Sequence, residues 1–379
     1  MTYNLLKKGL EVELYAGTES GEVLPLSRTI KDHFPNFAQE PDARNFEYIT
    51  KACTNYNELF KEIIIPRIKV RKFLTDLGNL TLIPGSTLSL PFDKKFYFSD
   101  SRDLYYRYIS KTYKTKVITT SLHINIGITD YKNLFKLICA LRLDLSLLLA
   151  LSASSCFYDG RLTNFYSYRW HNFPRNPDFI PFFTTHDQYI NWTEEQIKTK
   201  TMFNVRHLWT GIRPNGPNRP YKLNRLEIRI CDLVFDTKKI LGIVALIETL
   251  VQKYLTEEEW PKVLNTSQAK LNKLAKLADK QEELISRFGL NATIWDWRND
   301  SQDKAYKIID SLYKDIRTTA NRIGTLKHLN SISDILHEGN EATQFLNMYK
   351  KNKSIEATIQ HFIKQFTMMD FKYLRMIKK

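Results

Sequence analysis

Alternation of charged and apolar residues in short segments places the strongest constraint on this chain. In "NRLEIRICD", Arg225, Glu227 and Arg229 alternate with three apolar residues. Successive side chains of a β-strand point to opposite faces of the sheet, so the three charges share one face. Such a face is hard to place in a core. It favours a sheet that lines a polar cavity, and a sheet face open to solvent is the alternative.

A second alternating segment, "GLEVELYAG", carries two carboxylates on one face of an early strand. Glu11 and Glu13 are two residues apart, which separates their positions by roughly 7 Å along the strand. Burying two unpaired anions is very unfavourable, so either one of them is protonated or a cation lies between them. An edge strand whose glutamates face water is the alternative. The pair alone does not decide between the two.

Further candidate ligands lie in two other strand-like segments. Glu40 and Glu47 stand seven residues apart around "EPDARNFEY", and His123 shares a strand face with Asn125 in "SLHINIGI". Taken singly, a solvated glutamate and a hydrogen-bonded core histidine are the commoner interpretations. Taken together, many carboxylates with one imidazole suit Mg²⁺ or Mn²⁺ and not structural zinc. Carboxylates, divalent cations and arginines are what phosphoryl transfer requires.

Composition and missing motifs exclude several functional classes. The 379 residues carry a net charge of +15. The lysines and arginines are spread along the chain, which favours a basic surface or a nucleotide substrate over specific nucleic-acid binding. The sequence contains neither a Walker A motif nor a kinase glycine-rich loop. The apolar run 134–154 includes three charged residues, so it predicts a buried helix and no membrane span.

Four widely spaced cysteines and a polar beginning favour a cytoplasmic protein. Cys53, Cys139, Cys156 and Cys231 have no CxxC spacing, and "MTYNLLKKGLEVE" lacks the apolar region of a signal peptide. We therefore expect free thiols in a reducing compartment.

The pattern of the chain changes near residue 236. Before it, strand and helix signals are mixed, including a helix that begins near Thr54, is interrupted at Pro66 and stops at Gly78, and a long strand over 116–128. After it, only helical patterns follow. The sequence predicts a catalytic α+β body over 1–258 and an all-helical C-terminal region over 259–379. The pattern leaves open whether that region packs as part of the same domain.

The ordered set of these segments resembles glutamate–cysteine ligases of the cyanobacterial type. That family is similar to carboxylate–amine ligases and, more distantly, to glutamine synthetase. The likeness is carried through residues 8–235 by "GLEVELY", "EPDARNFEY", "LIPGSTLSL", "TKVITTSLHINIGI", "LALSASSCFYDG", "RHLWTGIRPNG" and "LNRLEIRICD". The resemblance implies an α+β fold in which a curved, mostly antiparallel sheet forms a funnel. ATP and metals would lie inside it, with helices packed outside.

The resemblance also implies roles for particular residues. Glu13, Glu40 and Glu47 would hold the metal nearest the substrate carboxylate, and Glu11, His123 and Glu227 would hold the metals on the ATP phosphates. Arg229, with Glu227, would be catalytic and would stabilise the transferred phosphoryl group. Arg169 would bind the α-carboxylate of glutamate. Further substrate contacts would come from Arg206, Arg213, Arg225 and Asn125, the last of which stands where many relatives have a second histidine.

The implied activity is ATP-dependent formation of γ-glutamylcysteine from L-glutamate and L-cysteine. Its intermediate would be a γ-glutamyl phosphate, and its product would begin glutathione biosynthesis. The alternative is a related ligase that joins glutamate or another amino acid to a different amine. We expect Mg²⁺ or Mn²⁺ as cofactor, ATP as co-substrate, and a monomer or homodimer that binds neither nucleic acid nor membranes.

Overall fold

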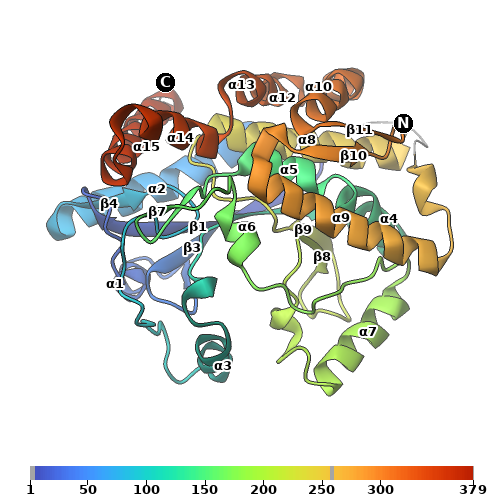
Figure 1. Cartoon of the computed structure of the whole chain (residues 1–379), viewed down its shortest axis with the longest axis horizontal. Helices are drawn as coiled ribbons and strands as arrows, with labels where there is room; N and C mark the ends of the chain where they lie inside the picture. The colour runs from blue at the N-terminus through green and yellow to red at the C-terminus, as the bar shows by residue number, and fades with distance from the viewer. Residues whose placement is uncertain (1–4, 257–259, 379) are drawn as a thin grey trace.

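A seven-stranded antiparallel sheet forms the centre of the computed structural model, which describes residues 5–256 and 260–378 (Figure 1). The strand order is β2-β3-β1-β5-β9-β8, and β4 also pairs with β1. The sheet is not closed into a barrel. Its strands are β1 (Lys8–Thr18), β2 (Phe37–Gln39), β3 (Asn45–Ile49), β4 (Leu80–Ile83), β5 (Leu122–Gly127), β8 (Ile212–Asn215) and β9 (Arg225–Ile228).

The pairing register brings the predicted polar residues together on one face of this sheet. Glu13 lies opposite Glu47 on β3, and Glu11 lies opposite His123 on β5. Further along, Glu227 on β9 lies opposite Asn125 and Arg213. Residues that face each other across antiparallel strands have neighbouring side chains. Charges that are far apart in the sequence are therefore neighbours on one surface.

The opposite face of the sheet is apolar and forms the core. Leu10, Val12 and Leu14 alternate with the glutamates of β1 and are fully buried. They belong to one hydrophobic cluster that also includes residues of α2 (Tyr56–Gly78) and α8 (Thr237–Thr256). Burial of this face at about 25 cal/mol per Å² fixes which face of each strand remains available for chemistry.

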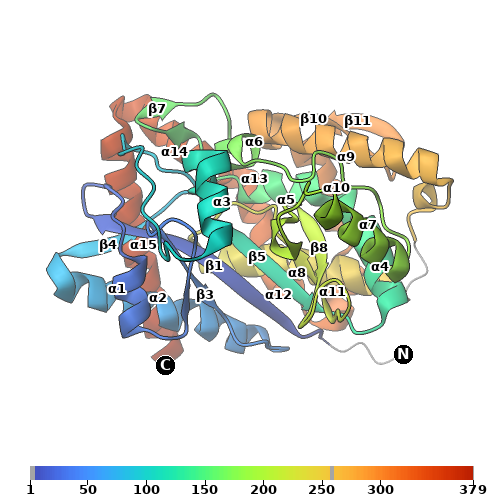
Figure 2. The ribbon, with the colours of Figure 1, turned by 90° about the horizontal axis from the view of Figure 1, so that it is seen from below.

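The remaining elements surround the sheet. Figure 1 shows α8 and the C-terminal helices above it and α3 and α7 below it, and Figure 2 shows α3 crossing in front of the sheet. The helices before α8 are α1 (Ser27–His33), α3 (Leu104–Tyr113), α4 (Tyr131–Arg142), α5 (Leu145–Ser152), α6 (Tyr168–Asn172) and α7 (His186–Lys198). Those after it are α9 (Gln268–Phe288), α10 (Ala305–Asp315), α11 (Arg317–Ile323), α12 (Leu326–Leu329), α13 (Ser331–Glu338), α14 (Glu341–Asn352) and α15 (Ile355–Lys378).

Several local expectations need correction. Helix α2 begins at Tyr56, is capped by Asn55 and runs through Pro66 without interruption. Proline costs about 3 kcal/mol in a helix interior, and the long buried face of α2 outweighs that loss. The strand expected over 116–128 is confined to β5, and a short 3₁₀ helix (Lys114–Val117) precedes it.

Two small hairpins were not expected. One is β6 (Phe157–Tyr158) with β7 (Arg161–Leu162), in the segment between α5 and α6. The other is β10 (Thr293–Asp296) with β11 (Ser301–Lys304), which lies in the otherwise helical C-terminal part. Its turn ends at Asp300, which has a left-handed backbone conformation (φ 48°). Asp and Asn are the side chains that tolerate that conformation best, so Asp300 suits the turn, and the prediction of an all-helical C-terminal region is wrong at this hairpin.

The C-terminal part packs directly on the body. Asp370 on α15 is fully buried and pairs with Arg67 and Arg71 of α2, each at 2.7 Å. The main hydrophobic cluster continues from the sheet into the C-terminal helices. The expected boundary at 258 lies outside the described residues, and the division into two domains stays a prediction. Among the helices of 5–256 and 260–378, none has both the length and the apolar character needed to cross a bilayer.

Candidate active site

A cavity of about 260 Å³ opens on the charged face of the sheet. Nine of the residues predicted from the sequence line it. The acidic strands β1 and β3 contribute one side. The arginines approach from the residue after β9, from β8, from α6 and from the 3₁₀ helix Val205–His207. The nine are Glu11, Glu13, Glu40, Glu47, His123, Arg169, Arg206, Arg213 and Arg229.

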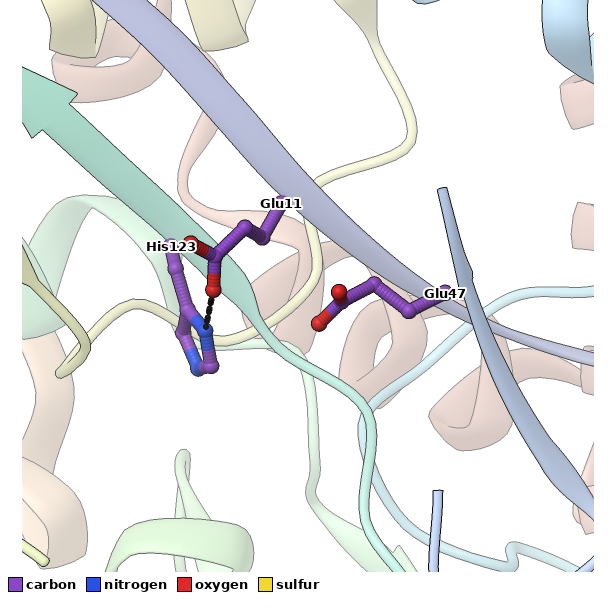
Figure 3. Close-up of side chains that lie close together, drawn as sticks. All are labelled: Glu11, Glu47 and His123. Carbon is purple, nitrogen blue, oxygen red and sulfur yellow. Dashed lines mark hydrogen bonds and ion pairs between the residues drawn. The ribbon is translucent and has the colours of Figure 1, made fainter. Parts of the chain in front are cut away.

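The carboxylates form two groups that share one member. Ligand atoms of Glu11, Glu47 and His123 lie within 4.8 Å of one another, and so do those of Glu13, Glu40 and Glu47. Figure 3 shows the first group, with side chains from β1, β3 and β5 directed toward one another. Glu11 and Glu13 thus belong to different groups although they are two residues apart, and Glu47 is common to both.

His123 lies between the carboxylates of β1. Its Nδ1 is 3.0 Å from Oε2 of Glu11, and its Nε2 is 2.8 Å from the hydroxyl of Ser121. Oε1 of Glu13 lies 3.6 Å from Nε2. The ring is almost fully buried, so these contacts fix its orientation and place both nitrogens next to oxygen atoms.

Burial and mutual repulsion perturb these carboxyl groups. Burial and the neighbouring Glu13 raise the pKa of Glu40 to about 8. Burial and then Glu40, Glu11 and Glu13 raise the pKa of Glu47 well above its usual value. For Glu11, burial acts to raise the pKa, but the His123 hydrogen bond and the charge of Arg229 outweigh it, so the pKa is lowered. The arginines and His123 therefore do not neutralise the negative charge of the carboxylates around Glu47.

This imbalance fits a divalent cation. A bound cation favours the ionised form of nearby carboxyl groups and reverses the shifts produced by burial and repulsion. The donor set is dominated by carboxylate oxygens with one imidazole, which is the chemistry preferred by Mg²⁺ and Mn²⁺. The residues present therefore fit the metal that the sequence led us to expect.

Glu227 is enclosed by arginines and belongs to neither carboxylate group. Arg213 donates to it through Nε (2.7 Å) and Nη2 (3.1 Å), and Arg229 donates through Nη1 (2.6 Å). Asn215 adds a fourth hydrogen bond at 2.7 Å. Burial acts to raise the pKa of Glu227, but Arg213 and Arg229 hold it well below its usual value. In the described structure, Glu227 therefore orients two arginines of the cavity, and its role as a metal ligand stays a prediction.

The other predicted substrate contacts differ in position. Asn125 donates to Glu11 (3.1 Å) and accepts from Nε of Arg225 (2.9 Å), so Asn125 lies between Glu11 and Arg225. Neither Asn125 nor Arg225 is among the residues that line the cavity. Arg206 is half-exposed at the cavity, 3.8 Å from Asp103. Arg169 is buried against Asp232 and lines the cavity from α6.

Sequence reasoning missed the aromatic wall of the cavity. Tyr105 on α3 and Trp209 line it, together with Trp170 and Phe173. Aromatic residues in loops and short helices have no periodic signal, so the sequence pattern did not assign them to the site. Asn45 was missed for another reason: its amide hydrogen-bonds the Thr119 carbonyl and contacts Glu13, which depends on tertiary structure.

The comparison with protein families decides the assignment. A model of glutamate–cysteine ligase family 2 matches residues 7–361. The chain belongs to this family. It is therefore a ligase that forms a carbon–nitrogen bond. A relative from Herpetosiphon aurantiacus, named "Putative glutamate--cysteine ligase 2", is 24% identical over 323 residues, which is 83% of this chain and 80% of the relative.

Two solved structures share the fold of this family 2 ligase. A bifunctional glutathione synthetase from Pasteurella multocida superposes with a TM-score of 0.75 at 14% identity over 97% of this chain, and the chain spans about half (53%) of that protein. A glutamate–cysteine ligase from Francisella tularensis in complex with AMP has a TM-score of 0.69 at 12% identity and covers 100% of this chain and 94% of its own. At these identities the likeness establishes the fold alone.

Proposed function

We propose that this protein is an ATP-dependent glutamate–cysteine ligase. It would form γ-glutamylcysteine from L-glutamate and L-cysteine through a γ-glutamyl phosphate, the first step of glutathione biosynthesis. The observation that carries the proposal is the pair of carboxylate groups sharing Glu47, next to arginines held by Glu227. Family membership and the AMP complex of the Francisella protein support ATP as co-substrate.

Two metal positions follow from the carboxylate groups. Glu13, Glu40 and Glu47 would hold one Mg²⁺ or Mn²⁺, and Glu11, Glu47 and His123 would hold another. When bound, such ions neutralise phosphate oxygens and help to align the transferred group. We assign Glu227 to the arginines first, because two of them already use its carboxylate. A metal could reach it only if those ion pairs opened.

The arginines supply the charge stabilisation that belongs to the chain itself. Arg229 is fixed by Glu227 and lines the cavity beside His123, so it would contact the γ-phosphoryl group during its transfer from ATP to the γ-carboxylate of glutamate, with ADP as the leaving group. Arg213 is held in the same way and would contact the phosphates. Arg169 would bind the α-carboxylate of glutamate. Donors fixed before the reaction stabilise developing charge without reorganisation.

The second half of the reaction forms the amide. The cysteine amine would attack the acyl carbonyl, the carbon–oxygen bond to phosphate would break, and inorganic phosphate would leave. The amine must lose a proton. A carboxylate at the cavity would accept it.

An ADP-release assay with a panel of amines tests the proposal. Purified protein is mixed with ATP, Mg²⁺ and L-glutamate, and then with L-cysteine, glycine or ammonia. We expect ADP release to depend on glutamate and to be fastest with cysteine, with γ-glutamylcysteine identified by mass spectrometry. Equal rates with cysteine, glycine and ammonia would overturn the assignment of cysteine and favour a ligase for a different amine.

A further inference from the structure

We propose that Asp232 is a positioning residue that sets glutamate recognition by holding Arg169 at the cavity. This inference rests on the proposed function, because it takes Arg169 as the group that binds the α-carboxylate of glutamate. Asp232 follows β9 by four residues and is fully buried. It does not line the cavity. It acts on the substrate only through Arg169.

The carboxylate of Asp232 joins three separate segments. Its Oδ1 accepts from Nε of Arg169 (2.7 Å) and from the hydroxyl of Ser167 (2.8 Å). Its Oδ2 accepts from the backbone N–H of Ser154 (2.9 Å) and from the hydroxyl of Ser155 (2.7 Å). Both oxygens are thus saturated. The end of the catalytic sheet, the chain after α5 and the start of α6 are tied to one anion.

These contacts determine which edge of the Arg169 guanidinium faces the cavity. Nε is bound to Asp232, and Nη2 donates to the backbone oxygen of Ile230. The edge that carries Nη1 is the one left for the cavity, which Arg169 lines with Trp170. The backbone of Arg169 is also fixed, because its N–H donates to Ser155 (3.1 Å). An arginine held this firmly loses little conformational entropy when it binds a carboxylate.

A purely structural role is the competing explanation, and the chain offers a matched control for it. Asp144 is also buried and pairs with Arg298 at 2.7 Å and 2.9 Å. It likewise accepts two more hydrogen bonds, from Trp297 and Tyr254. Neither Asp144 nor Arg298 lines the catalytic cavity. Asp144→Asn therefore removes a comparable buried ion pair away from the proposed glutamate site.

The test compares L-glutamate with 4-aminobutyrate, which has the same reacting carboxylate and lacks the α-carboxylate. In Asp232→Asn we expect KM for L-glutamate to rise about tenfold or more, as for loss of a charge-assisted contact, while KM for ATP stays within about twofold. The preference for L-glutamate over 4-aminobutyrate in kcat/KM should shrink by the same factor. Asp144→Asn should change stability and leave that preference unchanged.

Ser167→Ala keeps the carboxylate and removes one of its hydrogen bonds, so it carries the test if Asp232→Asn does not fold. It should give a smaller rise in KM for L-glutamate and a smaller loss of preference. An unchanged preference in every folded variant of Asp232 or Ser167 would overturn the inference.

Calorimetric titration of L-glutamate separates this inference from the proposed function. If the wild type binds L-glutamate without releasing ADP, the ligase proposal fails, and Asp232→Asn is judged by its Kd for L-glutamate. If the wild type neither binds nor turns over L-glutamate, both proposals fail together. If the wild type is active and Asp232→Asn keeps its preference, only the inference about Asp232 fails.

Discussion

Replacing Glu227 by glutamine should damage the fold and the chemistry together. The carboxylate accepts four hydrogen bonds, three from arginines and one from Asn215. Glutamine offers one oxygen, and its amide N–H₂ would point at guanidinium donors. At least one ion pair is therefore broken, and the positive charges of Arg213 and Arg229 are left without their shared anion.

The size of the effect follows from burial. Glu227 is fully buried, and Arg213 is nearly so. Burial and the charges of Arg219 and Arg229 already lower the pKa of Arg213 to about 9 despite the ion pair. Removing one partner of a buried ion pair costs about 3–5 kcal/mol. We expect a loss of unfolding free energy in that range, and turnover reduced by about 10³-fold because Arg229 is no longer held in position.

Urea denaturation and ADP release measure the two effects, and Glu11→Gln is the matched control. Glu11 is a cavity carboxylate that is more exposed, with 17% of its side chain accessible. Its replacement should reduce turnover and change the free energy of unfolding by about 1 kcal/mol or less. If Glu227→Gln unfolds at the same urea concentration as the wild type, the carboxylate does not neutralise the arginines and our account of this cluster is wrong.

Three further substitutions test other parts of the structure. Glu47→Gln removes the ligand common to both carboxylate groups, so half-maximal turnover should require about 10- to 100-fold more Mg²⁺, measured by metal titration; an unchanged requirement contradicts a shared ligand. Asp370→Asn leaves Arg67 and Arg71 buried without their anion and should cost about 3–5 kcal/mol in urea denaturation, whereas a loss below 1 kcal/mol would show that Asp370 does not hold the two arginines in place. Burial raises the pKa of Glu341 to about 8, so folding takes up a proton and stability falls as pH rises from about 4.5 to 8. Glu341→Gln should remove that slope, with a gain of about 3 kcal/mol at pH 7 and little at pH 4.5; parallel pH profiles would refute the shift.

Periodicity predicted the faces of the strands well, because it is a local property. The alternation in β1 placed Glu11 and Glu13 on one face and their apolar neighbours in the core, as observed. The same rule placed Glu227 of β9 and Arg229, the residue after the strand, on one face, where the two side chains form an ion pair. A period of two depends only on the backbone of a strand. Contacts between side chains of different strands depend instead on which strands pair and on their register.

Contacts that depend on register were not accessible from the sequence. Arg213 stands 14 residues from Glu227, and only the pairing of β8 with β9 sets them opposite each other. Asp232 is surrounded in sequence by apolar residues, and no local pattern indicates that it binds Arg169. The predicted interruption of α2 at Pro66 was wrong for the opposite reason: the local signal was present, and tertiary packing of the helix overrode it. In each case long-range packing decided the outcome.

The order of strands arranges the candidate site by charge. Carboxylates occupy β3 and β1, the imidazole is on β5, and the arginines follow at the end of β9 and on β8. One side of the cavity is therefore lined by carboxylates and the opposite side by arginines. A polyphosphate would be attracted to the arginine side and repelled by the carboxylates unless divalent ions covered them. Metal and phosphate should accordingly bind together, since the metal supplies the positive charge that the carboxylate side lacks and the phosphate supplies negative charge to the arginine side.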